Sequence, residues 1–248
     1  MRLCRKRRLS EKYWRRSQSL NRRKMPRGVY IHLPGNMTVF LQINTNRSRV
    51  AQALALHTLK EKEADVLCIS EPNSIPDHPG WVGRTDGKCA LYLQPNLQVL
   101  RTGSDIGIAW PELETLRVYS CYISPNCRPE EFDDFLEQLH SSASETTTEV
   151  IVSGDFNAHS QVFGSSRRDR RGEALLDTAQ SLNLVILNDG KTPTFPRGNS
   201  FLDLTFATPG IIRKLKTWEV LEEESMSDHQ YVFYSLKKTE KIIQPGRS

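Results

Sequence analysis

The chain has 248 residues, a net charge of +5 and an apolar fraction of 38%, with a mean hydropathy of −0.51. This length allows one large α/β domain or two small ones. No run approaches the roughly 18 apolar residues that a membrane helix needs, so we expect a soluble protein without a membrane partner. The N-terminus is highly charged and lacks an apolar core, which excludes a secretory signal.

The five cysteines indicate a reducing compartment. They are odd in number and form no CxxC pair. Cys68 and Cys121 fall inside apolar, strand-like runs, where a buried thiol is expected. The pattern therefore argues against both a zinc site and a disulfide framework.

Positive charge is concentrated at the N-terminus. Residues 1–28 hold twelve Lys or Arg and one acid, so the +5 of the whole chain leaves residues 29–248 at −6. The basic runs suit nucleic-acid binding, RNA included, or nuclear import, and a solvated segment is an equal alternative. We expect a disordered basic tail over 1–28, one domain over 29–238, and a C-terminal tail over 239–248.

Apolar spacing predicts the elements in chain order. The first strand spans 38–44, and a helix over 48–64 follows. Its expected apolar face consists of Val50, Ala53, Leu54, His57 and Leu59. Further strands are predicted at 65–70, 90–93, 106–110, 115–123, 150–155 and 184–187, and further helices at 129–141 and 172–183. The remainder reads as mostly β. Such a mixture favours helices that cover two packed sheets.

The stretch from Val150 to His159 is the most informative. A β-branched run stops at a glycine, and Asp155, Asn157 and His159 follow on alternate positions. A strand that carries reactive groups out of a sheet ends in this way, and an acid with an amide two residues later suits a phosphate. The alternative is an Asx-type turn, because Gly, Asp and Asn all favour turns.

Three other stretches have a similar form. A short apolar strand leads to Glu71 and is closed by a proline that cannot extend it. Asp203 interrupts an alternating run and needs a partner, because an unpaired buried charge is costly. Asp228 and His229 precede another strand and set an oxygen ligand beside a candidate base. Each stretch alone is explained equally well by a helix cap or a solvated loop. The four stretches together, in this order and at these spacings, are a specific signal of a functional site.

In this order and spacing the stretches resemble the endonuclease/exonuclease/phosphatase family. These metal-dependent phosphoesterases include the abasic-site endonucleases and deoxyribonuclease I. Within the family, the chain looks like the endonuclease domain of site-specific insect non-LTR retrotransposons, of the telomere-repeat (TRAS) type or a relative that inserts into ribosomal genes. The resemblance runs from about Thr38 to Leu236. It implies a four-layered α/β/β/α sandwich, like deoxyribonuclease I, with two packed sheets flanked by helices.

The resemblance also implies a metal site and a base. Glu71 would be the principal Mg²⁺ ligand, with Mn²⁺ as a substitute, and Asn44 would support the metal site. His229 would act on the scissile phosphate as base or electrostatic stabiliser, while Asp203 fixes its tautomer. Asp228 would lie near the metal or the attacking water.

Three further residues would serve the phosphate. Asp155 would activate water or protonate the leaving 3′ oxygen, and both roles stay open. Asn157 would donate to the phosphate, as would Tyr122, for which packing is the alternative. Asn46 stands where many relatives carry an acid, so we expect one principal cation. His159 is left outside the catalytic set.

The DNA contacts expected from the sequence lie in two segments. Residues 191–200 read as a hairpin, which in the retrotransposon branch lies over the DNA groove. Arg197 and Asn199 stand at its turn, and Thr194 and Ser200 are expected to reach backbone phosphates. The second segment is the basic cluster at 167–171, with Arg167 and Arg168, for which a solvated loop is the alternative.

The resemblance therefore predicts a Mg²⁺-dependent endonuclease that nicks one strand of a specific double-stranded DNA target. The 3′ hydroxyl would prime reverse transcription by a reverse transcriptase domain in the same parent polypeptide, since no polymerase motif is present here. A nuclear location is expected. The alternatives are an inositol-phosphate phosphatase, an abasic-site repair enzyme, and a nucleic-acid-binding module that has lost its catalytic set.

Overall fold

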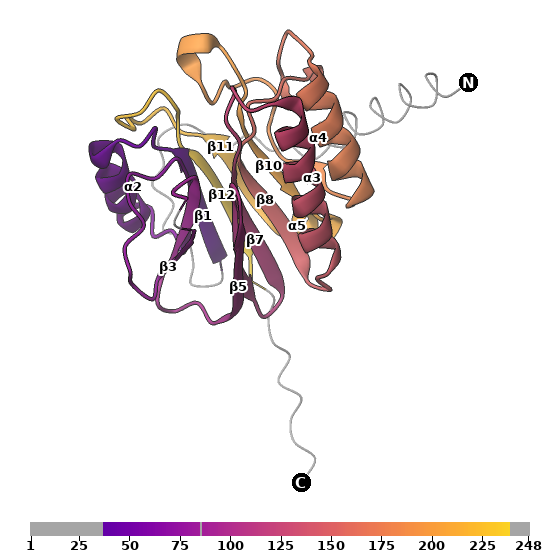
Figure 1. The fold of residues 1–248 in the computed structure, drawn as a ribbon. Coiled ribbons are helices and arrows are strands. Elements are labelled where there is room, and N and C mark those ends of the chain that lie inside the picture. Colours follow the sequence, from indigo (N-terminus) through magenta and orange to yellow (C-terminus); the bar gives the residue numbers. More distant parts are fainter. Residues whose placement is uncertain (1–36, 85, 239–248) are drawn as a thin grey trace.

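Two six-stranded sheets pack face to face in the computed structural model, which describes residues 37–84 and 86–238 (Figure 1). The expected tails over 1–28 and 239–248 lie outside these residues. The first sheet has the order β11 (Leu215–Val220), β12 (Val232–Lys237), β1 (Met37–Asn44), β2 (Val66–Ser70), β4 (Cys89–Leu93) and β3 (Trp81–Gly83). The second has the order β5 (Val99–Asp105), β6 (Ile108–Leu113), β7 (Leu116–Tyr122), β8 (Glu149–Asp155), β10 (Asp203–Ala207) and β9 (Val185–Ile186).

Helices cover the outer face of each sheet. α2 (Arg49–Glu61) lies on the first sheet, and α3 (Pro129–Ser144) and α4 (Arg170–Ser181) lie on the second (Figure 1). The short α5 (Pro209–Lys214) contributes two isoleucines to the core between the sheets. The expected four-layered α/β/β/α sandwich is confirmed.

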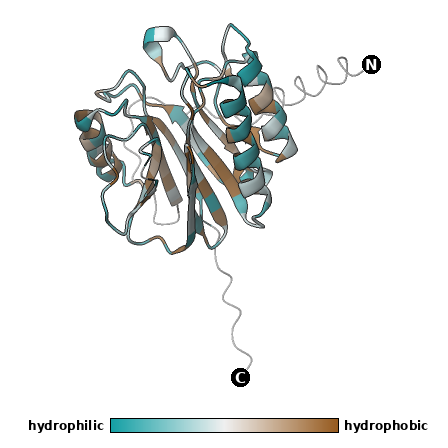
Figure 2. Cartoon of the chain, viewed as in Figure 1, coloured by the Kyte–Doolittle hydropathy of each residue, from teal (hydrophilic) through white to brown (hydrophobic). Residues whose placement is uncertain are grey.

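Successive side chains of each strand point to opposite faces of its sheet, and this alternation explains the layers. Phe40 of β1 lies in the core between the sheets, whereas Leu41 and Ile43 lie in the core under α2. In β8, Ile151 faces the other sheet and Val152 faces α3 and α4. Strands buried on both faces become nearly continuous apolar runs, which are visible as brown strands between helices with hydrophilic outer faces in Figure 2.

The predicted helix at 48–64 is present, but its predicted apolar face is correct only at Leu59 and, in part, at Leu54. Ser48 caps it by accepting a hydrogen bond from the Ala51 N–H. The buried residues are Ala51, Gln52, Ala55, Thr58 and Leu59, whereas Val50 is 60% exposed. Two small alanines let the helix lie close to the sheet. Gln52 is turned inward because its amide bonds the backbone of residues 73 and 74.

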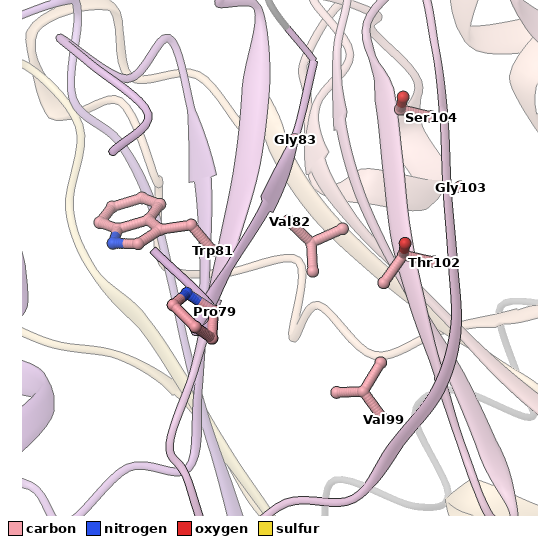
Figure 3. Close-up of a pocket in the computed structure, with 8 residues that line it drawn as sticks. All are labelled: Pro79, Trp81, Val82, Gly83, Val99, Thr102, Gly103 and Ser104. Atoms are coloured by element: carbon pink, nitrogen blue, oxygen red, sulfur yellow. The ribbon is translucent and has the colours of Figure 1, made fainter. Parts of the chain in front are cut away.

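The edge strands β3 and β5 flank a pocket of about 460 Å³ (Figure 3). Its lining consists of Pro79, Trp81, Val82, Gly83, Val99, Thr102, Gly103 and Ser104. None of these is titratable, and none is among the predicted site residues, so the pocket is not the site of the expected chemistry. Within the described ranges, no helix has the length and apolar character to cross a membrane.

Candidate active site

The predicted residues meet where strands of both sheets end. Asn44 is the last residue of β1, and Glu71 directly follows the neighbouring β2. In the second sheet Tyr122 and Asp155 end the parallel strands β7 and β8 in register with each other. Asp203 opens the antiparallel β10 directly opposite Asp155. Strand register therefore gathers one amide, one phenol and three carboxylates at a single edge of the sandwich.

Asn44 joins carboxylates that come from the two sheets. Its Nδ2 donates to Asp155 Oδ2 at 2.9 Å and, more weakly, to Glu71 Oε2 at 3.3 Å. Its Oδ1 accepts from the Asn46 N–H at 2.8 Å. Asn44 thus supports the carboxylates, and its own oxygen is already engaged by the backbone.

Asp203 and His229 form a buried hydrogen-bonded pair. His229 Nδ1 lies 2.7 Å from Asp203 Oδ2, and both residues are buried. A carboxylate at Nδ1 keeps the proton on that nitrogen and directs Nε2 away from it. Burial by itself lowers the pKa of His229, but Asp203 more than offsets this and raises the pKa to about 9. The imidazole is therefore biased toward its charged form at neutral pH.

Asp155 is the carboxyl with the most perturbed acidity in the site. Burial, followed by repulsion from Asp203, raises its pKa to about 7, although His229 and the hydrogen bonds from Asn44 and the Asn157 N–H act in the opposite direction. Ligand atoms of Asp155, Asp203 and His229 all lie within 4.8 Å of one another. A carboxyl that titrates near 7 can both give and accept a proton.

Tyr122 and Asn157 border this cluster. Tyr122 is 6% exposed. Burial, followed by the neighbouring Glu71, raises its pKa, so it stays a neutral phenol that can donate a hydrogen bond. Asn157 has a left-handed backbone, with φ of 45°, and its Nδ2 donates to the Ile123 carbonyl at 3.2 Å. In this conformation the Asn157 amide is bound to the protein itself.

Asp228 is bound by an arginine of the predicted DNA-contacting loop. Arg197 Nη2 lies 3.1 Å from Asp228 Oδ1, and Nη1 lies 3.3 Å from Oδ2. The Arg197 side chain is 75% exposed and that of Asp228 32%. Both carboxylate oxygens of Asp228 thus face a guanidinium that comes from 31 residues earlier in the chain.

The loop over residues 194–200 differs from the predicted hairpin because its tip is a 3₁₀ turn and a single bridge pairs its two sides. A bridge between Phe195 and Ser200 closes it, and a 3₁₀ turn, η2 (Pro196–Gly198), forms its tip, drawn in orange at the top of Figure 1. Arg197 and Asn199 are exposed there, and Ser200 is half-buried.

Thr194, which was expected to reach a DNA phosphate, points into the protein in this structure. Thr194 is fully buried, and its Oγ1 accepts from the N–H groups of Leu202 and Asp203 at 3.1 and 3.0 Å. The hydroxyl therefore secures the start of β10 and is not accessible to a phosphate.

The basic cluster at 167–171 is anchored at the start of α4. Arg167 and Arg168 are exposed; Arg167 contacts the His159 ring and Arg168 pairs with Glu173. His159 is buried, and burial followed by Arg167 lowers its pKa. Its backbone N–H donates to Asp169, the N-cap of α4. His159 therefore has a structural role in holding this cluster.

The donor set at this edge fits a hard divalent cation. The Glu71 side chain is 17% exposed, lies beside the Tyr122 phenol, and makes long contacts with Asn44 at 3.3 Å and with Arg47 Nε at 3.7 Å. Asp203 Oδ1 is buried and has no hydrogen-bond partner among the described residues. Carboxylate oxygens are the ligands that Mg²⁺ and Mn²⁺ prefer. Glu71 is the residue that would hold the ion, whereas Asp155 is left to handle a proton and His229 Nδ1 is already engaged by Asp203.

Two serines of the site were not predicted. Ser70 Oγ accepts from the Asp155 N–H at 3.2 Å and donates to the Cys121 carbonyl at 2.9 Å, which ties the sheets together under the site. Ser227 Oγ donates to the Asn44 carbonyl at 2.7 Å. Each serine directly precedes an acid of a recognised stretch, and that adjacency was the only indication in the sequence.

Comparisons with known proteins agree with this architecture. Residues 116–233 match the family model "Endonuclease-reverse transcriptase". No curated protein matches the chain. Among solved structures, the endonuclease domain of TRAS1, a telomere-specific non-LTR retrotransposon, superposes with a TM-score of 0.69 and 27% identity, covering 81% of this chain and 98% of that one.

Two more distant structures share the fold. The 3′ phosphatase NExo from Neisseria, bound to a product DNA hairpin, has a TM-score of 0.62 and 14% identity, covering 80% of this chain and 99% of that chain. An AP endonuclease from Archaeoglobus fulgidus has a TM-score of 0.58 and 13% identity, covering 79% and 98% respectively. The family match over residues 116–233 and the likeness to the TRAS1 domain show that the chain is similar to the endonuclease–reverse transcriptase family and has a fold of the deoxyribonuclease I type.

Proposed function

We propose that this chain is a Mg²⁺-dependent DNA endonuclease that nicks one strand of a specific genomic target and leaves a 3′ hydroxyl. The observation that carries the proposal is the cluster of Asp155, Asp203 and His229 within 4.8 Å, beside Glu71. Hydrolysis of a phosphodiester needs charge neutralisation, an activated water and help for the leaving oxygen, and this set offers a group for each.

A bound Mg²⁺, or Mn²⁺ in its place, would neutralise phosphate charge and polarise the phosphorus–oxygen bonds. His229, held by Asp203, faces the phosphate as a charged donor, consistent with its raised pKa. Asp155, with a pKa of about 7, exchanges a proton with the attacking water or with the leaving 3′ oxygen. Tyr122 and Asn157 donate hydrogen bonds to the phosphate oxygens once substrate is present.

The biological setting belongs to the same proposal. The TRAS1 domain is described as part of a telomere-specific non-LTR retrotransposon, and a telomeric or ribosomal target is proposed here by analogy. The new 3′ hydroxyl would prime a reverse transcriptase domain of the same parent polypeptide, in the nucleus. The basic residues of 1–28 would add affinity for DNA or RNA phosphates.

Nicking of supercoiled plasmid tests the activity. Plasmid is incubated with the protein and Mg²⁺ or Mn²⁺, with and without chelator. The wild type is compared with His229→Ala and with the matched control His57→Ala, whose imidazole is exposed on α2. We expect open-circular product from the wild type and from His57→Ala, and at least about a hundredfold less from His229→Ala. Nicking that survives both the chelator and His229→Ala would refute the proposal.

Three further substrates separate the related activities. The Neisseria and Archaeoglobus structures share only the fold at this identity, so a 3′ phosphatase and an abasic-site enzyme are alternatives for the assay to decide. If cleavage is confined to abasic DNA, the proposed function is wrong and an abasic-site activity takes its place. If phosphate is released from a 3′-phosphorylated end or an inositol phosphate without plasmid nicking, a phosphatase activity takes its place. Sequencing of nick ends on telomeric and ribosomal substrates identifies the target.

A further inference from the structure

The loop over residues 194–200 contacts both members of the Asp203–His229 pair. Thr194 Oγ1 accepts from the Asp203 N–H at 3.0 Å, and the Thr194 carbonyl accepts from the Gln230 N–H at 2.8 Å. One buried threonine is therefore bonded to the backbone at Asp203 and to the residue after His229. The base of the loop and the backbone of the pair form one hydrogen-bonded unit.

The next residue, Phe195, lies against the imidazole itself. The centroids of the Phe195 and His229 rings are 4.9 Å apart and their planes are tilted by 55°. The hydrogen bond from Nδ1 to Asp203 fixes one point of the imidazole but still allows the ring to pivot about that bond. An aromatic ring against the imidazole limits this pivot and excludes water from the contact.

Gly198 shows that the loop is closed tightly around this ring. A Cβ added at Gly198 would lie 2.9 Å from Phe195 Cδ1 and 3.0 Å from Cε1, closer than side chains normally approach. The Phe195 ring therefore contacts both the backbone of the loop tip and His229.

We propose that Phe195 is a positioning residue that sets the orientation of His229 and so links the DNA-contacting loop to catalysis. This inference rests on the proposed function, because orientation is read out as turnover of DNA. The tip that carries Arg197 and the ring that holds His229 belong to the same short loop, and Arg197 also binds Asp228. A change in the loop would thus alter turnover as well as target choice.

Kinetics of Phe195 variants test the proposal. In Phe195→Ala we expect kcat for nicking to fall about tenfold to a hundredfold, because small misplacements of a reacting group have effects of this size. KM should change by less than about threefold, because Phe195 is not expected to contact DNA. Phe195→Tyr should restore most of kcat, since it keeps the ring.

Trp81→Ala is the matched control. Trp81 makes an aromatic contact of nearly the same geometry with Tyr92, at 5.4 Å and 58°, and is half-buried like Phe195. It lies on the edge strand β3, so its loss should lower stability without changing kcat. A wild-type kcat in folded Phe195→Ala, or an equal fall of kcat in Trp81→Ala, would overturn the inference.

Gly198→Ala provides a second test if Phe195→Ala does not fold. It keeps every side chain of the site but forces the Phe195 ring to shift. We expect a lower kcat at nearly unchanged thermal stability, and an unchanged kcat would contradict the proposal. If the wild type itself fails to nick DNA, the proposed function fails; if the wild type nicks DNA and these variants match it, only the positioning role fails.

Discussion

Replacing Asp155 with asparagine should stabilise the folded protein while abolishing nicking. The wild-type carboxyl has a pKa of about 7, raised from its ordinary value of 3.8 by burial and by Asp203. Folding therefore favours its protonated form. The stability associated with that form is present below about pH 4 and is lost as the pH rises through about 7. The neutral amide of the Asp155→Asn variant carries no such dependence, so the difference between the two proteins should grow with pH.

The size of the effect follows from the same two pKa values. A rise from 3.8 to about 7 corresponds to roughly 4 kcal/mol at high pH, of which roughly 3 kcal/mol is lost between about pH 5 and pH 8. The asparagine also disturbs a hydrogen bond from Asn44 or from the Asn157 N–H. That loss costs about 1–3 kcal/mol at every pH, so it does not alter the pH dependence.

Urea unfolding of both proteins at about pH 5 and pH 8, in chelator, measures this difference. Chelator is needed because a bound cation would stabilise the carboxylate. Asp77→Asn, at an exposed carboxylate, is the matched control and should show the same pH dependence as the wild type. If the stability difference between Asp155→Asn and the wild type is the same at both pH values, the assigned perturbation of Asp155 is incorrect.

Three other predictions concern the cation, the loop and the seam between the sheets. Glu71→Gln should remove the Mg²⁺-dependent rise in Tm, which for the wild type corresponds to about 2–3 kcal/mol at a hundredfold excess over Kd; a full Mg²⁺ response in the variant would place the ion elsewhere. If Arg197 leaves Asp228 for a DNA phosphate, Arg197→Ala should weaken DNA binding and lower the magnitude of the slope of log affinity against log salt by about 1. Fluorescence anisotropy measures both quantities. An unchanged slope would mean that Arg197 stays paired with Asp228 and contacts no phosphate. Ser70→Ala leaves the Asp155 N–H and the Cys121 carbonyl without their shared partner, so unfolding should require about 1–3 kcal/mol less; an unchanged urea midpoint would contradict this role.

The sheets and the position of the site were predictable because they depend on local order in the chain. Each stretch of the candidate site is an apolar strand that ends on, or begins with, a polar residue, and strands in register bring such ends together. The edge strand β5 was not predicted as observed. It is exposed over most of its length, so it lacks the apolar alternation from which a strand is inferred.

Side-chain direction was less predictable. Thr194 belongs to a segment that the family resemblance placed over the DNA groove, which suggested that its hydroxyl reaches a backbone phosphate. Whether such a hydroxyl points outward or caps a strand depends on where β10 begins, which is a tertiary property. The buried face of α2 was also mispredicted at Val50, because the face that a helix buries is set by its packing on the sheet: Val50 is exposed and the adjacent Ala51 is buried.

The pairing of Arg197 with Asp228 lies further beyond sequence reasoning, and it changes how the site is understood. The sequence predicted a DNA contact for Arg197 and a place near the metal or the attacking water for Asp228, as two independent roles. The structure joins them through two N–O contacts, so neither is free until something replaces the other. A DNA phosphate is the natural competitor for the guanidinium, because its two free oxygens offer the same bidentate geometry as the carboxylate. The Arg197 side chain is the more exposed partner, so we expect DNA binding at the loop to draw Arg197 away and to free the Asp228 carboxylate.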